Sequence, residues 1–239
     1  MIKSLMTNLF HFGSHSSIEL QSRPRESIEE KNIVLNDNIS LLSVYNGALS
    51  DSYRGDFLDV EVSRDIIETD MVVIIVTTSG CYLPNFRGFK KAIFVDHDNS
   101  SMSTSIFYKK YDRQDQTIYR VKKETDDLLI TALTLRGPDM LIDAKAYIDT
   151  AQGTRGLAYA PRVKTANYGA VITCFSYADP IIVDIKNQFT VSAFTSDNLG
   201  QAVGISSSED IKSERIKARS DLPYLKGKGD TLTCSLSLF

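Results

Sequence analysis

The chain has 239 residues, of which 42% are hydrophobic and 24% are charged. This is the composition of an ordinary globular protein, and it excludes a mainly disordered or low-complexity chain. With 27 Lys and Arg residues against 30 Asp and Glu residues the formal net charge is −3, so any nucleic-acid-binding surface must be local.

The N-terminal region is expected to precede the folded domain. Leu5, Leu9 and Phe12 recur at helical spacing and predict a short amphipathic helix, which could dock on the domain or lie on a membrane. We expect it to dock on the domain. Residues 14–32 are rich in Ser, Glu and Arg and are typical of a linker. Residues 1–32 are therefore predicted to be an amphipathic segment followed by a linker.

From residue 33 onward, short apolar segments rich in β-branched and aromatic residues alternate with turn residues. They predict strands over residues 39–45, 57–62, 71–77, 92–95, 105–108, 117–121, 128–135, 140–148, 170–177, 181–185 and 189–194. Many short strands without long helices favour an all-β fold. We predict an antiparallel, jelly-roll-like β-sandwich over residues 33–195, with short flexible or helical terminal extensions.

Two helical features are expected beside these strands. One or two helical turns are predicted over residues 63–70, where Ser63 would provide the cap and Ile66 and Ile67 would face inward. Near the C-terminus the charged stretch 209–219 predicts a solvated helix. We therefore predict that residues 196–239 form a charged tail outside the core.

The membrane and cysteine patterns are those of a soluble protein. The longest apolar run, residues 71–76, is far shorter than the ~20 residues that cross a bilayer. Cys81, Cys174 and Cys234 are far apart and form no Cys-x-x-Cys pair, so neither a disulfide framework nor a zinc site is predicted. We expect a cytosolic, reducing location.

Charge is segregated along the chain. Residues 87–123 hold nine Lys and Arg residues against four Asp residues. The nine are Arg87, Lys90, Lys91, Lys109, Lys110, Arg113, Arg120, Lys122 and Lys123, and they are interleaved with Phe89, Phe107, Tyr108, Tyr111 and Tyr119. Cations that neutralise phosphates beside rings that stack on bases would bind single-stranded RNA. Alternatively, the rings face the core and the lysines solvate the other face, and composition does not decide between the two.

No motif predicts catalysis. His97 lies between Asp96 and Asp98, but on a strand it points away from both carboxylates, so the three cannot converge on a metal ion. Asp96 is instead expected to cap a turn by accepting the backbone N–H groups of Asp98 and Asn99. A hydrolase that uses Asp96 and His97 is the least favoured function. We expect no catalytic residue, no metal site and no cofactor.

The order of three segments resembles the core of the 30K superfamily of plant-virus movement proteins. An apolar strand, 71–77, leads through the turn 81–88 to a second strand, 92–96. In that family the second strand ends in an Asp, which Asp96 matches. A Gly follows some fifty to seventy residues later, which Gly153 matches by lying 57 positions after Asp96, with Gly156 as a second candidate. The matched residues are Leu83, Pro84, Arg87, Gly88, Asp96 and Gly153.

The resemblance covers residues 60–195 and implies a non-enzymatic movement protein. Such a protein would bind single-stranded RNA, self-associate and carry the viral genome through plasmodesmata. Its implied partners also include host plasmodesmal proteins and a membrane that it contacts peripherally. Its implied location is the host cytoplasm and plasmodesmata, with association to the endoplasmic reticulum.

Two considerations qualify that implication. Family members often carry a long basic tail, whereas residues 209–230 hold six cations against five acids, so RNA binding through a tail is not expected. The alternative function is a virion structural protein, a capsid or matrix subunit, because a β-sandwich serves that role equally well.

Overall fold

The computed structural model describes residues 25–51, 55–97, 102–150, 157–178, 183–186, 188–209, 216–219 and 230–239. These residues form sixteen strands and no helix. The first eight are β1 (Arg25–Val34), β2 (Ser40–Leu49), β3 (Phe57–Glu61), β4 (Met71–Ser79), β5 (Lys90–His97), β6 (Met102–Lys110), β7 (Ile118–Lys122) and β8 (Leu128–Arg136). The others are β9 (Leu141–Thr150), β10 (Leu157–Tyr159), β11 (Ala170–Tyr177), β12 (Asp184–Lys186), β13 (Phe189–Thr195), β14 (Gly200–Ser207), β15 (Lys217–Arg219) and β16 (Asp230–Leu238).

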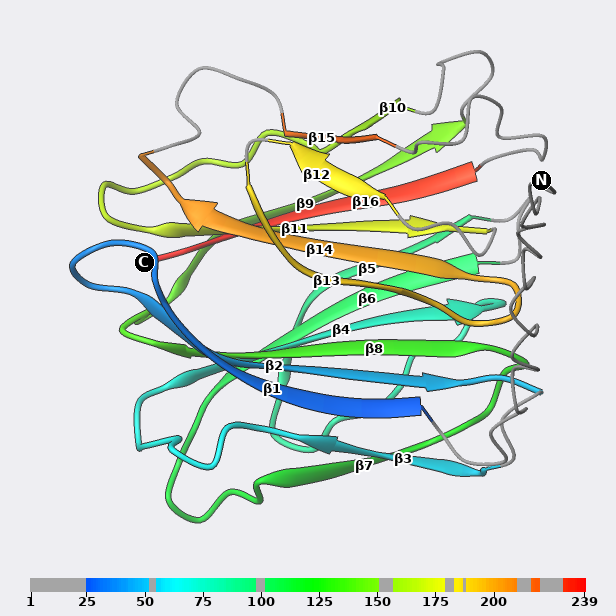
Figure 1. Ribbon diagram of the computed structural model, residues 1–239, viewed down its shortest axis with the longest axis horizontal. Coiled ribbons are helices and arrows are strands. Elements are labelled where there is room, and N and C mark those ends of the chain that lie inside the picture. The colour runs from blue at the N-terminus through cyan, green and yellow to red at the C-terminus, as the bar shows by residue number, and fades with distance from the viewer. Residues whose placement is uncertain are drawn as a thin grey trace, which may run out of the picture.

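Two large antiparallel sheets face each other, which confirms the predicted all-β, antiparallel sandwich (Figure 1). The six-stranded sheet has the order β1-β2-β8-β4-β6-β5, and the five-stranded sheet has the order β13-β14-β11-β16-β9. A β3–β7 ribbon covers the outer face of the first, and a small β10-β15-β12 sheet covers that of the second. Each large sheet is thus built from one half of the chain.

The layering explains the continuous apolar run in β4. Val73 and Ile75 belong to the cluster between the two large sheets, whereas Val72 and Ile74 pack with Leu58 under the β3–β7 ribbon. Both faces of β4 are therefore covered by other strands. A strand buried on both faces reads as an unbroken apolar run instead of an alternation.

A chain of buried polar side chains crosses between the large sheets. Thr131 Oγ1 on β8 donates to Gln201 Oε1 on β14 at 2.6 Å, and Gln201 Nε2 donates to Thr77 Oγ1 on β4 at 2.8 Å. The hydroxyls of Thr77 and Ser176 on β11 are 2.7 Å apart. Because a buried polar group is costly without a partner, these bonds help to fix how the sheets align.

The C-terminal strands correct one predicted boundary. β16 lies inside the five-stranded sheet, paired with β11 on one side and β9 on the other, and β14 pairs with β11 and β13. Leu232 and Leu236 of β16 are fully buried. The prediction that residues 196–239 form a tail outside the core is therefore wrong, because this region supplies two buried strands of the second sheet. Within the stretch 209–219 predicted to be helical, Lys217–Arg219 forms β15 instead.

The N-terminal boundary also moves. β1 begins at Arg25 and pairs along β2, so the sandwich starts before residue 33 and includes part of the predicted linker. The predicted amphipathic helix lies in residues 1–24, outside the described residues.

The expected helical turn after β3 is a series of tight turns. Ser63 Oγ accepts the backbone N–H of Asp65 at 3.2 Å, as a cap would. Ile66 packs against the core under the ribbon, as predicted. Ile67 is 53% exposed, so its predicted inward orientation is wrong.

Candidate nucleic-acid interface

Most of the predicted nucleic-acid-binding cations are already held by carboxylates. The pairs are Lys109 with Asp115, Lys110 with Asp139 (2.6 Å), Arg113 with Glu68 (3.0 Å), Arg120 with Asp59 (2.7 Å), Lys122 with Glu124 (3.7 Å) and Lys123 with Asp51 (2.9 Å). Of these carboxylates, Asp115 alone lies within residues 87–123. Folding therefore pairs six of the nine cations, five of them with acids from outside this segment, and neutralises much of the local excess. Exposed ion pairs contribute little stability each, but a paired cation attracts phosphate less.

Three cations of the set lie apart from these pairs. Among the described residues, no ion pair joins Arg87, Lys90 or Lys91 to a carboxylate. All three side chains are exposed, on the turn before β5 and on the first two residues of that strand. β5 is the edge strand of the six-stranded sheet. Among the described residues, the unpaired positive charge of the predicted set is thus concentrated at the β5 edge of the six-stranded sheet.

A β-bulge shapes this edge. The register between β5 and β6 shifts between Lys91 and Ile93, so that Lys91 lies opposite Phe107 and Phe94 lies opposite Ser105. Phe107 and Ser105 share a face of β6, and the extra residue therefore places Lys91 and Phe94 on one face. The Lys91 ammonium lies 5.7 Å from the centre of the Phe94 ring, within cation–π range.

The interleaved aromatic rings mainly anchor the turn. Phe86 packs against Phe107 with ring centroids 5.1 Å apart, and Phe89 meets Tyr119 edge to face at 5.0 Å. Phe86 and Phe107 are each only 5% exposed. Tyr108 packs against the cluster between the sheets. The alternative interpretation, that the rings face the core, is therefore favoured for this group. The packed rings of Phe86 and Phe89 flank Arg87 and Gly88 and fix the turn.

The matched motif residues occupy this turn and the end of β5. Pro84 is buried, whereas Leu83 is 40% exposed. Gly88 has a φ of +83°, a conformation that a side chain disfavours. The Cys81 thiol donates to Asp96 Oδ2 at 3.3 Å, so the end of β5 contacts the start of the turn. Asp96 is thus held beside the turn that carries Leu83, Pro84, Arg87 and Gly88.

Some motif predictions lie beyond the described part of the chain. Gly153 is outside the described residues, and so are Asp98 and Asn99, whose backbone N–H groups Asp96 was expected to accept. His97 is 4% exposed, whereas Asp96 on the other face of β5 is half-buried. Within the described ranges, no three His, Cys, Asp or Glu side chains are placed to hold a metal ion.

The neighbouring β3–β7 ribbon carries two carboxylates, Asp59 and Glu61, beside Arg120 and Lys122. Arg120 donates two hydrogen bonds to Asp59, at 2.7 and 2.8 Å, and these bonds lower the pKa of the Asp59 carboxyl. Burial, followed by repulsion from Asp59 and Glu61, raises the pKa of Glu26 on β1. Negative charge near β1 and β3 would repel phosphate, so the ribbon is a poorer surface for RNA than the β5 edge.

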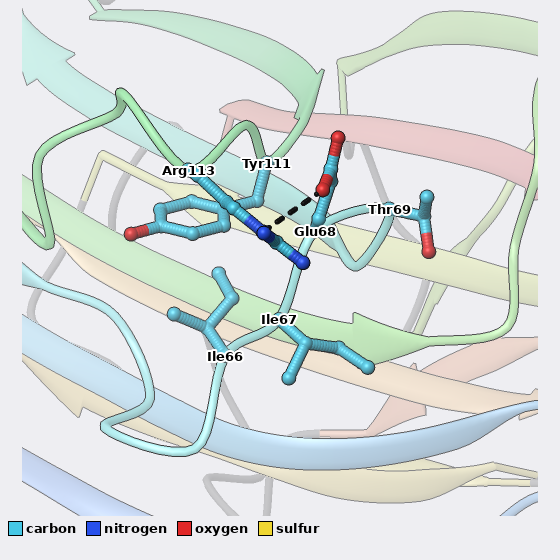
Figure 2. Close-up of a pocket in the computed structure, with 6 residues that line it drawn as sticks. All are labelled: Ile66, Ile67, Glu68, Thr69, Tyr111 and Arg113. Atoms are coloured by element: carbon cyan, nitrogen blue, oxygen red, sulfur yellow. Dashed lines mark ion pairs between the residues drawn. The ribbon is translucent and has the colours of Figure 1, made fainter.

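An open pocket of about 580 Å³, which sequence analysis missed, lies between the β3–β4 and β6–β7 loops (Figure 2). Its lining residues are Ile66, Ile67, Glu68, Thr69, Tyr111 and Arg113. Met71, which follows the β3–β4 loop, pairs with Lys110, which precedes the β6–β7 loop. Lys91 pairs with Phe107 nearby on β6, so the pocket and the cationic edge share one end of the sheet. Tyr111 and Arg113 belonged to the predicted cationic segment, whereas Ile66 and Ile67 of the β3–β4 loop were predicted as the inward face of a helical turn and not as the wall of a pocket.

Comparison with known proteins adds no relative: no protein-family model, no curated protein and no solved structure matches the chain. In the part of the chain that the structure describes, no helix combines the length and apolar character needed to cross a bilayer. Arguments about function therefore rest on the motif, the fold class and the geometry of the β5 edge.

Proposed function

We propose that this protein is a viral cell-to-cell movement protein that binds single-stranded RNA, self-associates and carries the viral genome through plasmodesmata. The same proposal includes peripheral contact of the protein with a membrane, and contact with host plasmodesmal proteins. The motif resemblance supplies the biological role. The observation that carries RNA binding is that, among the described residues, Arg87, Lys90 and Lys91 are exposed and outside ion pairs, on the turn that bears the motif and at the start of β5.

The chemistry of this edge suits phosphate contact without sequence readout. A guanidinium can hold two phosphate oxygens, whereas lysine ammonium groups act as point charges. If each of the three cations neutralises one phosphate, log affinity should fall against log salt with a slope of about −2, from about −0.7 per phosphate on single strands. Such binding is independent of base sequence, as transport of a whole genome requires.

RNA binding by purified full-length protein at several salt concentrations tests this proposal. Replacing Arg87, Lys90 and Lys91 with Gln should weaken binding to single-stranded RNA and bring the salt slope close to zero. The matched control replaces Lys110, Arg120 and Lys122 with Gln, which removes the same formal charge from paired cations. The control should retain most of the affinity and most of the slope. Equal losses in the two triple variants would show that total charge, and not the β5 edge, governs binding.

A virion structural protein remains the second candidate, because a two-sheet sandwich is a common architecture for capsid subunits. Expression of the protein alone in plant epidermal cells separates the two functions. A movement protein should give punctate foci that span the cell wall. Diffuse protein, or assembled particles, would instead support the structural role and contradict the transport proposal.

A further inference from the structure

The pocket between the β3–β4 and β6–β7 loops has one apolar wall and one planar, polar wall (Figure 2). Ile66 and Ile67 form the apolar side, and Ile67 is 53% exposed although it is a large aliphatic residue. The Tyr111 ring and the Arg113 guanidinium offer flat surfaces. Single-stranded nucleic acids are recognised by stacking unpaired bases on such aromatic rings and guanidinium planes.

The pocket is shaped before any ligand enters. The backbone N–H of Thr69 donates to the Tyr111 carbonyl at 3.0 Å, and the N–H of Tyr111 donates to the Asp70 carbonyl at 2.7 Å. Asp70 is buried and accepts two hydrogen bonds from Arg136, at 3.0 and 3.2 Å. Thr69 is held at a φ of +82°, an unfavourable conformation for a β-branched residue. Such strain persists where the surrounding contacts fix the backbone, and it is frequent at ligand sites.

The polar groups of the pocket can form hydrogen bonds with the edge of a nucleobase. Arg113 Nε donates to Glu68 Oε2 at 3.0 Å, and both side chains are largely exposed. An exposed ion pair of this kind is weak, so its donors and acceptors can be shared with a ligand at little cost. A base presents both acceptors and N–H donors along its edges, and it can therefore engage Arg113 and Glu68 together. Phosphate would instead be repelled by Glu68.

The pocket lies close to the cationic edge. Lys91 lies opposite Phe107, and Tyr111 follows four residues further along the chain from Phe107. At roughly 3.3 Å per residue this is about 13 Å along β6, plus about 5 Å for one strand spacing. A few nucleotides span that distance, so one RNA strand can contact Lys90 and Lys91 and also place a base in the pocket.

We propose that this pocket takes up one unstacked nucleobase of the bound RNA strand, with a preference for guanine. Guanine offers O6 and N7 as acceptors for Arg113, and its ring and amino N–H groups as donors to Glu68. It can therefore form more hydrogen bonds with these two side chains than the other bases can. The base stacks beside Tyr111 and packs on Ile66 and Ile67. This inference rests on the proposed RNA-binding function and adds a base-selective site to it.

The test measures binding of the full chain to two fluorescent probes, a short oligouridylate and the same oligomer with one central guanosine. Wild-type protein should bind the guanosine probe about tenfold more tightly. Glu68→Gln should abolish this preference, so that the two probes bind with equal affinity. Tyr111→Ala should weaken binding of both probes about fivefold or more, because the stacking surface is lost while the backbone bonds of residue 111 remain. Thermal unfolding establishes that each variant is folded.

The outcomes separate the two proposals. Salt-dependent binding of both probes with no preference for guanosine, or a preference that survives in Glu68→Gln, overturns the base pocket and leaves the proposed RNA-binding function intact. Absence of any RNA binding by the wild-type protein overturns both. Lys122→Gln, a substitution on the neighbouring ribbon, is the control. If Tyr111→Ala loses no more affinity for RNA than this control does, the pocket has no role in binding.

Discussion

At the scale of single residues, Gly88 shows how backbone conformation supports the candidate interface. Its φ of +83° lies in the region that residues with a Cβ disfavour, and it turns the chain between Arg87 and the start of β5. A Cβ added at Gly88 would lie 2.9 Å from Lys109 Nζ, which is the end of a flexible side chain. Backbone strain, more than crowding, therefore explains the need for glycine here.

We predict that Gly88→Ala lowers the free energy of unfolding by roughly 1–2 kcal/mol, the cost of holding a residue with a Cβ in a left-handed conformation. Gly88→Asn should lose less, since Asn tolerates this conformation better than Ala. Urea denaturation measures both variants. If Ala and Asn were equally harmless, the turn would have to adopt another backbone conformation than the one observed.

The ion pairs at this scale mark the limit of what sequence could predict. The exposed cationic turn was found from composition, and Arg87, Lys90 and Lys91 were among the predicted residues. The neutralisation of the other cations was not visible, because Lys110 meets an acid 29 positions away and Lys123 meets one 72 positions away. Only strand pairing brings those charges together, and a linear count of charges cannot anticipate it.

At the scale of elements, β4 and β16 show why one strand could be predicted from the sequence and another was missed. β4 was predicted because burial on both faces makes it an unbroken apolar run. β16 alternates Thr and Ser with Leu and Cys from Thr231 to Leu238, a period-two pattern that predicts a strand. The charged stretch before it led to its assignment as a tail. Buried Thr and Ser side chains also gave it a polar appearance, although they face another layer of the protein and not solvent.

Substitution within β16 tests its place in the core. Leu236 is fully buried in the cluster between the large sheets, so Leu236→Ala should destabilise the protein by about 2–5 kcal/mol through lost burial and the cavity left behind. Thermal or urea unfolding of the full chain measures the effect. Phe239, which follows the strand and is 46% exposed, provides the control, because Phe239→Ala should cost much less. Equal and negligible effects at both positions would instead support the prediction that β16 belongs to a tail outside the core.

At the scale of the whole molecule, the two halves of the chain each supply one large sheet, so their contact decides whether they fold together. The apolar cluster between the sheets supplies most of this contact, and apolar packing alone tolerates small shifts in alignment. The hydrogen bonds of Gln201 to Thr131 and Thr77 are directional and link β14 with β8 and β4. They therefore favour one alignment of the sheets over its neighbours.

We predict that Gln201→Met lowers the free energy of unfolding by about 1–3 kcal/mol, because two buried hydroxyl groups lose a partner. The loss should fall near the lower end, since Thr131 also contacts Ser192 at 3.1 Å and Thr77 also contacts Ser176 at 2.7 Å. Urea unfolding should remain one cooperative transition with an unchanged slope, as expected if both sheets unfold together.

Gln201→Glu extends this test by placing a charge at the same buried position. Burial raises the pKa of an isolated carboxyl above its unfolded value, so the variant should be nearly as stable as wild type at low pH and lose stability as pH rises through the raised pKa. Unfolding midpoints of wild type, Gln201→Met and Gln201→Glu across a pH series measure this difference. If Gln201→Glu is less stable than wild type by the same free energy at every pH, the position is hydrated. The hydrogen-bonded contact between the two sheets would then not be the dry contact that the full burial of Gln201 indicates.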